Sequence, residues 1–351
     1  MKKRFIYLFL AFVFIFSSCD DIIEKNTPEN VFEVFWRTMD ENYVFFEEKG
    51  IDWDSIYSVY APQAQEAAND EDLKRIFSEI IPLFKDKHLS IMNTEKYGIR
   101  YINTEMDTIF HVFFGWEEDC GFKRKSFDVH IPYICSENTN KHIALVKINS
   151  FVDFNYYSDI AMEKNPVKVL DLLDFEKGLI IDLRNNSGGV RPNLYNLISA
   201  FYAGNKILSY EQYKIGKNHD QFSDKKPEIV SGQNLVPEYI PIIVLTSAMT
   251  YSAGNYAVYL LKDIRNCTII GEATSGGGGG RKDVVLPNGW ILSFPCNKAF
   301  SPNNRNMEYE HEPDVFVKSY YNMLVKDSTG NIIYRDTTLL TAIAELDKLN
   351  N

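Results

Sequence analysis

The pattern of apolar and polar residues predicts a helical N-terminal region that runs into β-structure. Apolar and aromatic residues recur at helical spacing over Val31–Phe46, and further helices are expected at Ile51–Tyr60 and Asp72–Phe84. A short strand, Leu89–Met92, is expected directly after them. From Glu95 to Asn140 apolar and polar residues alternate, with turns between, which predicts a few antiparallel strands.

The rest of the chain alternates between short apolar runs, which predict buried strands, and segments of helical periodicity. The polar stretch Ser209–Gln233 is expected to form a surface hairpin or a flap over a cleft. The other expected elements are strands at Ile143–Phe151, Leu179–Leu183, Ile242–Leu245 and Thr268–Gly271, helices at Tyr156–Leu173, Asn193–Tyr202 and Leu339–Leu349, and a hairpin over Val284–Pro295.

One strand–turn–helix stretch, Pro241–Asp263, carries the first candidate for catalysis. Small and hydroxylated residues join its strand to its helix, and Ser252 lies at the expected helix N-terminus. Free backbone N–H groups and the helix dipole favour negative charge there, so a serine at this point can act as a nucleophile. The N–H group of Ala253 can then hold an oxyanion. An N-cap serine without a catalytic role fits the same pattern.

Two glycine-containing turns are the next candidates. Gly188 and Gly189 follow the strand Leu179–Leu183, and glycines there let backbone N–H groups approach a ligand closely. An ordinary strand-to-helix turn fits equally well, and the stretch is neither a P-loop nor a GxGxxG motif. The segment Glu272–Gly280 holds five consecutive glycines, which predicts a flexible loop or one lined by backbone.

Charge and composition narrow the classes of function. The formal net charge is −11, and no basic block follows the first residues, which argues against nucleic acid as a partner. The aromatic content of 14% is typical of an ordered, well-packed protein, and the length suits one large domain or two modest ones. His88 lies where the helical region meets the first strand, and a lone histidine there is either structural or catalytic.

The N-terminus is predicted to be an export signal rather than part of the fold. Basic residues open the chain and are followed by an apolar stretch, Phe5–Phe16, that is short for a membrane span. Ser17-Ser18-Cys19 then resembles the end of a bacterial lipoprotein signal, in which Cys19 would be lipidated. A plain signal peptide is the alternative. The acidic residues that follow resemble the export tag of surface lipoproteins in Bacteroidetes, and a tether is expected to reach Asn30.

The remaining cysteines do not predict a metal site. None of Cys120, Cys135, Cys267 and Cys296 forms a CxxC pair, and no His/Cys cluster has zinc spacing. Cys120 and Cys135 are either bridged, if the compartment is oxidising, or buried thiols. No metal and no cofactor is expected.

Four stretches, in this order, resemble one family: IIDLRNNSGG, LTSAMTYSAGNYAVYLLKD, IIGEATSGGG and EYEHEPDVFV. Together they are similar to the serine peptidases of the tail-specific, or C-terminal-processing, group, especially its tricorn-like branch. The opening stretches VFWRTMDENYVFF, IDWDSIY and FKDKHLSI resemble the N-terminal part of tricorn-core-like bacterial members. The resemblance implies an α/β fold with a crotonase/ClpP-like core of ββα units wound into a spiral.

This resemblance implies a division of the chain into five parts. They are a lipoprotein signal (1–19), a tether (20–30), a helical N-terminal unit (31–92), a short strand-rich segment (93–142) and the peptidase core (143–351). Many relatives carry a PDZ domain between the helical unit and the core. Too few residues separate His88 from the strand at Ile143–Phe151 for such a domain, so none is expected.

The resemblance also implies roles for individual residues. Ser252 falls on the nucleophile, Ala253 would supply one oxyanion-binding N–H group, and the turn Gly188-Gly189 would supply the other. In Ser-Lys relatives a lysine stands where this chain has Gly277, which puts a lysine base in doubt, and Lys262 is no obvious substitute.

The tricorn-like branch uses histidine as the base and a glutamate to orient it. His88 lies on the matching position, and Glu308 is the best match for the glutamate, with Glu310 as the alternative. Two departures leave room for a weakened site: Lys87 stands where tricorn has a serine, and Asn255 where many relatives have an acidic residue.

Two functions follow from the resemblance. The first is a serine endopeptidase that hydrolyses peptides or unfolded proteins in the cell envelope, anchored through a lipid at Cys19, in the outer membrane and facing the periplasm or the surface. The second is a catalytically weak or inactive protein that uses the same fold to bind an apolar or peptide ligand. The oligomeric state stays open.

Overall fold

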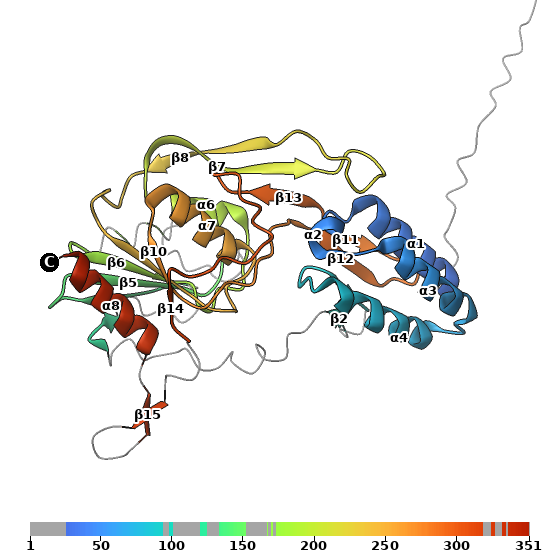
Figure 1. Cartoon of the computed structure of the whole chain (residues 1–351), viewed down its shortest axis with the longest axis horizontal. Coiled ribbons are helices and arrows are strands. Elements are labelled where there is room, and N and C mark those ends of the chain that lie inside the picture. The colour runs from blue at the N-terminus through green and yellow to red at the C-terminus, as the bar shows by residue number, and fades with distance from the viewer. Residues whose placement is uncertain are drawn as a thin grey trace, which may run out of the picture.

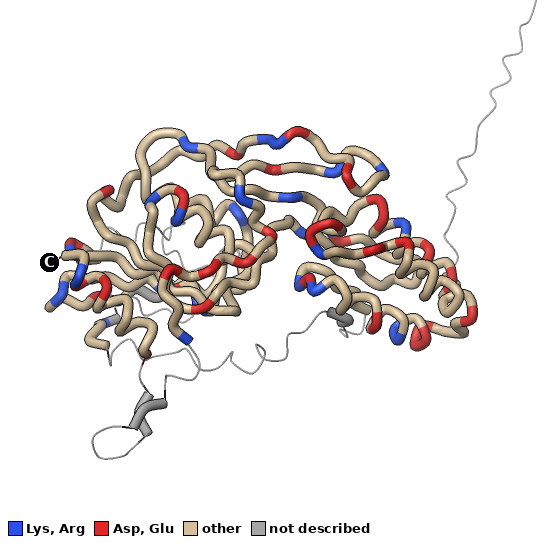
Figure 2. The backbone as a smooth tube through the Cα atoms, viewed as in Figure 1, with Lys and Arg blue, Asp and Glu red and all other residues tan. Residues whose placement is uncertain are grey.

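The computed structural model describes residues 26–93, 98–100, 120–124, 133–151, 167, 170, 173–318, 324–326, 332–334 and 336–350. Two units lie side by side, a helical unit with one hydrophobic core and a larger α/β unit with a core on each face of its sheet, and a long hairpin spans both units (Figure 1). Acidic and basic residues are interspersed along the backbone of both units (Figure 2).

Short helices build the helical unit around an aromatic core. They are α1 (Pro28–Asn42), α2 (Phe46–Lys49), α3 (Trp53–Glu66), α4 (Asp70–Ile80) and the 3₁₀ helix η1 (Ile81–Phe84). Side chains of Thr27, Asp52 and Asn69 cap three of the N-termini, each cap being worth about 1 kcal/mol. The ring centroids of Phe35 and Phe77 are 4.7 Å apart, which locks α1 to α4.

A hairpin from the C-terminal half of the chain completes this unit. The four-stranded sheet has the order β11–β12–β1–β2, formed by Arg281–Val285, Ile291–Pro295, Ser90–Met92 and Gly98–Arg100. β1 pairs antiparallel with β12, and Ser90 lies opposite Ser293. Leu292 and Phe294 of β12 are buried in the core of the helical unit, so the part of the chain that follows the glycine-rich loop is fixed beside β1, the strand that begins just after His88.

The α/β unit is built on a seven-stranded sheet of order β14–β10–β9–β6–β5–β4–β3. Its strands are Val315–Phe316, Thr268–Gly271, Ile242–Thr246, Gly178–Asp182, Ile143–Ile148, Tyr133–Asn138 and Lys123–Arg124. β14 to β5 are parallel, whereas β4 and β3 are antiparallel to their neighbours. The inner strands are continuous apolar runs because helices cover both faces of the sheet.

Alternate residues of each strand pack against different helices. Leu179 and Ile181 of β6 face the core formed with α6 (Arg191–Ser199) and α7 (Ala253–Arg265). Ile180, between them, faces α8 (Thr337–Leu349) on the other side (Figure 1). This arrangement puts the N-termini of α6 and α7 at the same end of the sheet, where β6 and β9 finish.

A three-stranded sheet links the two units. It has the order β13–β7–β8, formed by Asn297–Phe300, Ala203–Tyr213 and Lys226–Gln233. The tip of the β7–β8 hairpin contacts the helical unit, where His219 Nε2 lies 2.8 Å from Asp40 Oδ1. A small pair, β15 (Leu324–Lys326) with β16 (Ile332–Tyr334), lies near the C-terminus.

The predicted elements compare well with these bounds. The prediction of one helix over Val31–Phe46 was wrong in detail, because the chain turns between α1 and α2. The polar stretch Ser209–Gln233 belongs to the β7–β8 hairpin, whose first strand begins earlier, at Ala203. The predicted helix Tyr156–Leu173, the leader and the pairing of Cys135 lie outside the described residues or side chains. Within the described part of the chain, no helix is long and apolar enough to cross a membrane.

Candidate active site

Ser252 lies in a strained backbone conformation at the start of α7. Its φ of 53° and ψ of −122° are unusual for a residue with a side chain. The Ser252 N–H donates to Gly276 O at 2.9 Å, which ties the residue to the glycine-rich loop. The side chain makes no capping hydrogen bond to α7. Ser252 thus stands at the N-cap position without capping the helix through its side chain, and its hydroxyl group has another partner.

That partner is His88, whose Nε2 lies 3.1 Å from Ser252 Oγ. The distance is within the range over which a base takes a proton from a hydroxyl group. His88 comes from the turn between η1 and β1, and Ser252 comes from the α/β unit, so the pair spans the two units. His88 Nδ1 is buried and has no hydrogen-bond partner among the described residues.

The surroundings of His88 favour its neutral form. Burial is the main cause that lowers the pKa of the imidazole below its usual value, and the charges of Arg281 and Lys49 lower it further. The charge of Asp86 acts in the opposite direction. A histidine with a lowered pKa is unprotonated near neutral pH, which is the form that a general base needs.

Asp86 is a buried carboxylate beside His88 that the sequence analysis did not single out. Its Oδ1 accepts the backbone N–H of His88 at 2.8 Å, and its Oδ2 accepts the hydroxyl of Tyr43 at 2.9 Å. Asp86 therefore fixes the backbone turn that presents the imidazole. The signal was present in the stretch KDKH, but spacing alone does not distinguish this aspartate from a solvated charge.

The turn at Gly188 lies directly against Ser252. A side chain at position 188 would meet Ser252, because its Cβ would lie 2.7 Å from Ser252 Cβ and 3.3 Å from the nitrogen of Ala253. Gly188 also has a φ of 114°, which disfavours any other residue. Both constraints explain the glycine, and they put the peptide group after Gly188 next to the serine.

Two backbone N–H groups at this place are candidates for an oxyanion hole. The Gly188 N–H donates to Asn186 Oδ1 at 2.9 Å, so within the predicted turn Gly188-Gly189 the candidate donor is the N–H of Gly189. The N–H groups of Gly189 and Ala253 donate to no acceptor among the described residues. Asn186 is a second residue that the sequence analysis missed, and its Nδ2 also donates to Ile148 O at 2.9 Å.

The glycine-rich loop is lined by backbone rather than flexible. Its residues Gly276–Gly279 are buried, and Gly277 N–H donates to Glu308 O at 3.2 Å. A Cβ at Gly276 would lie 2.2 Å from Glu308 O, and one at Gly278 would lie 2.2 Å from Glu308 N. Only glycines permit this approach, so their run brings the segment of Glu308 alongside Ser252.

Glu308 is buried in the site but does not contact His88. Its Oε1 lies 2.6 Å from Lys49 Nζ, and its Oε2 accepts the N–H of Gly278 at 2.7 Å. Burial, the largest effect, and the charge of Asp86 raise the pKa of Glu308 to about 7, whereas Lys49 opposes the shift. Glu310, the alternative in the sequence analysis, is exposed.

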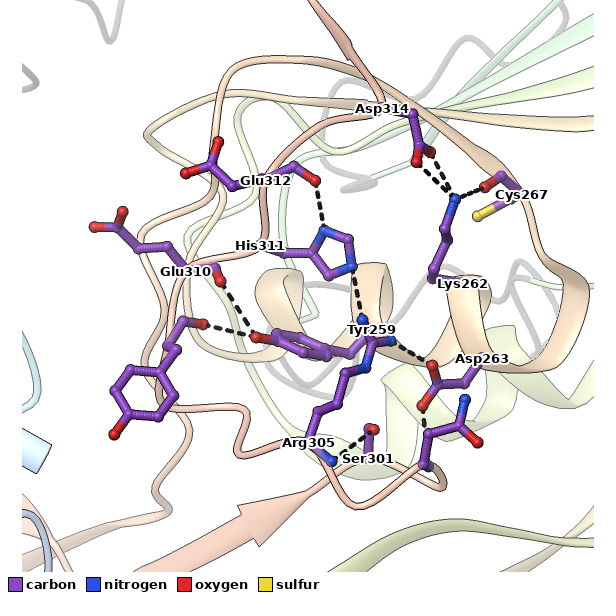
Figure 3. Close-up of polar contacts among 12 residues, drawn as sticks. Tyr259, Lys262, Asp263, Cys267, Ser301, Arg305, Glu310, His311, Glu312 and Asp314 are labelled. Carbon is purple, nitrogen blue, oxygen red and sulfur yellow. Dashed lines mark hydrogen bonds and ion pairs between the residues drawn. The ribbon is translucent and has the colours of Figure 1, made fainter.

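Polar contacts anchor the segment that carries Glu308 (Figure 3). Tyr259 of α7 donates its hydroxyl to the backbone oxygens of Tyr309 and Glu310, and Arg305 contacts His311. Asn255, buried in α7, donates to Met307 O at 2.8 Å, so this departure from the family pattern holds the segment in place.

Lys262 cannot act as the base. Its Nζ lies 2.9 and 2.7 Å from the two carboxylate oxygens of Asp314 and 3.0 Å from Cys267 O (Figure 3). The lysine therefore ties α7 to the start of β14, away from Ser252.

Comparison with known families agrees with this arrangement. Residues 142–317 match the model of peptidase family S41, and residues 25–81 match the tricorn protease C1 domain. The chain belongs to peptidase family S41, a family of serine peptidases.

Individual relatives support the same assignment. The carboxy-terminal processing protease CtpA of Bacillus subtilis (strain 168) is 26% identical over 162 residues, which cover 46% of this chain and 31% of CtpA. The match thus spans about a third of that relative's length. A crystal structure of a candidate peptidase from Parabacteroides merdae ATCC 43184 has a TM-score of 0.72 and 27% identity, and covers 92% of this chain and 97% of its own.

More distant structures share the fold alone. Mature CPAF has a TM-score of 0.61 at 13% identity, and covers 85% of this chain and 93% of its own. A lipoprotein from Streptococcus agalactiae has a TM-score of 0.57 at 17% identity, and covers 92% and 97%. The predictions of an α/β fold and of membership in a serine peptidase family are confirmed, whereas the roles of individual residues stay predictions.

Proposed function

We propose that the protein is a serine endopeptidase in which Ser252 is the nucleophile and His88 is the general base. The observation that carries the proposal is the 3.1 Å contact between His88 Nε2 and Ser252 Oγ. It joins two residues from separate units of the fold, and the strained backbone of Ser252 is typical of a functional site.

The reaction follows from this geometry. His88 takes the proton of Ser252 as the hydroxyl oxygen attacks the carbonyl carbon of a peptide bond, and a tetrahedral oxyanion forms. His88 then gives the proton to the departing amine, which leaves an acyl group on Ser252. Water, activated by the same imidazole, hydrolyses this ester and releases the serine.

The oxyanion is assigned to the N–H groups of Gly189 and Ala253. Each donor of this kind contributes roughly 3 kcal/mol to lowering the barrier. Glu308 is assigned an electrostatic role, in which its negative charge would stabilise the imidazolium that forms during attack. A direct hydrogen bond from Glu308 to His88 is not part of the proposal, because the carboxylate is held by Lys49 and Gly278.

Peptides or unfolded proteins of the cell envelope are the proposed substrates. The leader, with Cys19 at its end, supports export and a lipid anchor, which would keep the enzyme at a membrane surface, the outer membrane in our proposal. One relative is named a carboxy-terminal processing protease, which supports polypeptide as the substrate class. The five-part division of the chain made from the sequence is part of the same proposal.

Active-site labelling tests the function most directly. A fluorophosphonate probe should label the wild-type protein at Ser252 and should not label Ser252→Ala. The alternative is a binding protein on the same fold. Lys87 and Asn255, which differ from the residues that the resemblance leads us to expect, would favour this alternative. Wild-type protein that neither reacts with the probe nor cleaves an unstructured protein would favour that alternative.

A further inference from the structure

A buried ion pair joins the helical unit to the catalytic centre. Lys49, the last residue of α2, places its Nζ 2.6 Å from Glu308 Oε1, and the exposed fractions of the two side chains are 19% and 3%. The other carboxylate oxygen accepts the N–H of Gly278 at 2.7 Å. Each unit therefore holds one oxygen of the same carboxylate.

The segment that carries this carboxylate is hydrogen-bonded to the loop that holds Ser252. The backbone of Glu308 accepts the N–H of Gly277, and the neighbouring Gly276 accepts the N–H of Ser252. On the other side, Asp86 and Lys49 act electrostatically on both Glu308 and His88. A change in the charge or position of Glu308 is therefore expected to reach the serine through the loop, and Lys49 and Asp86 are charged groups that Glu308 shares with the base.

The charge of Glu308 depends on its partners. Burial raises its pKa to about 7, and Lys49 is the nearby cation that opposes this shift. Burial acts to lower the pKa of Lys49, but attraction to Glu308 and Asp86 raises it overall, so the ammonium group stays charged. The titratable groups that interact with Glu308 are Lys49 of α2, Tyr43 and Asp86 of the helical unit, Tyr251 and Tyr256 next to or within α7, and the adjacent Tyr309.

We propose that Lys49 is a positioning residue of the site, whose ammonium group keeps the Glu308 carboxylate ionised and in place against the loop that holds Ser252. This inference rests on the proposed peptidase function. It gives the helical unit a second role besides supplying His88, because Lys49 at the end of α2 then determines whether Glu308 of the α/β unit is ionised. If α2 were removed or displaced, the buried carboxylate of Glu308 would lose its neighbouring positive charge. It would then take up a proton, because a buried and unpaired charge is costly.

The test compares the pH dependence of kcat/KM in matched variants. Activity should fall as pH drops through the pKa of Glu308, near 7 in the wild type. In Lys49→Met this acid limb should move to higher pH by about one unit or more, the usual effect of an adjacent opposite charge. Lys49→Arg should keep the acid limb at its wild-type pH, because arginine keeps the positive charge.

The control variant is Lys298→Met. Lys298 forms a similarly buried ion pair with Glu48 of α2, at 2.6 Å, but does not touch Glu308. It should lower the melting temperature without moving the acid limb. An unchanged limb in Lys49→Met, or an equal movement in Lys298→Met, would overturn the proposal.

A double variant separates the effect on Glu308 from a direct effect on His88, since Lys49 also lowers the pKa of the imidazole. In a Glu308→Gln background, Lys49→Met should move the acid limb much less than in the wild-type background, because only its direct effect on the pKa of His88 remains. The same movement in that background would assign the effect to His88 and contradict the proposal.

A readout that needs no activity separates failure of this inference from failure of the proposed function. At pH 7.5, infrared difference spectra of Lys49→Met against Lys49→Met/Glu308→Gln should contain the C=O stretch of a protonated carboxyl group. Wild type against Glu308→Gln should contain much less of it. A missing carboxyl band in the first pair would overturn the inference even if the wild-type protein proved inactive.

Discussion

The ring of Tyr251 occupies the space that a side chain at Gly277 would need. A Cβ at position 277 would lie 2.4 Å from Cε2 of Tyr251, and the φ of Gly277 is +90°. The same tyrosine ring lies 4.8 Å, centroid to centroid, from the ring of His88. Tyr251 therefore fills the space beside Gly277 and packs against the ring of His88.

This relationship predicts that a lysine base cannot be restored by one substitution. Gly277→Lys should lose activity and stability, because both the backbone conformation and the tyrosine ring oppose the side chain. The double variant Gly277→Lys/Tyr251→Ala should regain part of the melting temperature. Hydrolysis by Gly277→Lys at the wild-type rate would contradict this view of the site.

The strain at Ser252 predicts different stabilities for two inactive variants. Ser252→Ala and Ser252→Gly both remove the nucleophile, so both should fail to hydrolyse an unstructured protein. Glycine tolerates a φ of 53°, so Ser252→Gly should be more stable than Ser252→Ala by about 1 kcal/mol. Chemical denaturation measures this difference. Equal stability of the two variants would contradict the inference of backbone strain at Ser252. Activity in either variant would contradict the assignment of Ser252 as the nucleophile.

Asn186 offers a test of the oxyanion site that leaves Ser252 and His88 intact. Its side chain accepts the Gly188 N–H and so orients the next peptide group, that of Gly189. Asn186→Ala should lower kcat by roughly tenfold to a hundredfold with little change in KM, since the loss falls on the transition state. Asn186→Asp, which keeps the acceptor oxygen, should lose less. A change confined to KM would point to substrate binding instead.

The two candidate residues that the structure brings together, Ser252 and His88, could be singled out from the sequence, whereas the contacts around them could not. Ser252 and His88 each belong to a local stretch with a recognisable setting, a strand–turn–helix and a helix-to-strand junction. Lys49 and Asp86 carry no such signal, because a charged residue at the end of a short helix or turn is usually solvated. Their roles depend on how α2 and η1 pack against the α/β unit, which periodicity does not report.

The structure of the glycine-rich loop could not be predicted from the sequence either. Five glycines in a row suggested either mobility or a backbone-lined loop, and composition could not separate the two. The loop is lined by backbone because Glu308 and its neighbours pack against it. These residues come from another part of the chain, and they can approach only because the glycines have no Cβ atoms. Gly188 was likewise recognised as part of the site, but its N–H group is used by Asn186.

The leader predicts a lipid at Cys19. Cys19→Ala should block lipidation, and the protein should then stay unprocessed or be released in soluble form. Labelling with radioactive palmitate in cells measures the modification, and Cys296→Ala serves as a control because that cysteine lies in the folded part. Palmitate in the Cys19→Ala protein would rule out this anchor.

The base predicts both a loss of activity and a change in pH dependence. His88→Ala should lower kcat/KM by at least about a hundredfold, the lower range for general-base catalysis. Lys262→Ala should lose far less, because Lys262 is bound to Asp314, and Glu308→Gln should fall between them.

Because the pKa of His88 is lowered, two effects of pH can be predicted, one on activity and one on stability. In Glu308→Gln, the acid limb that remains should lie below the ordinary histidine value of about 6.5. Below that pH the unfolded chain binds a proton that the native imidazole does not, so the free energy of unfolding falls as pH falls. The wild-type protein should therefore lose more stability between pH 7 and pH 5 than His88→Ala does. An acid limb above 6.5 in Glu308→Gln, or parallel stability curves for wild type and His88→Ala, would show that His88 is not the neutral base that the Ser252 contact requires.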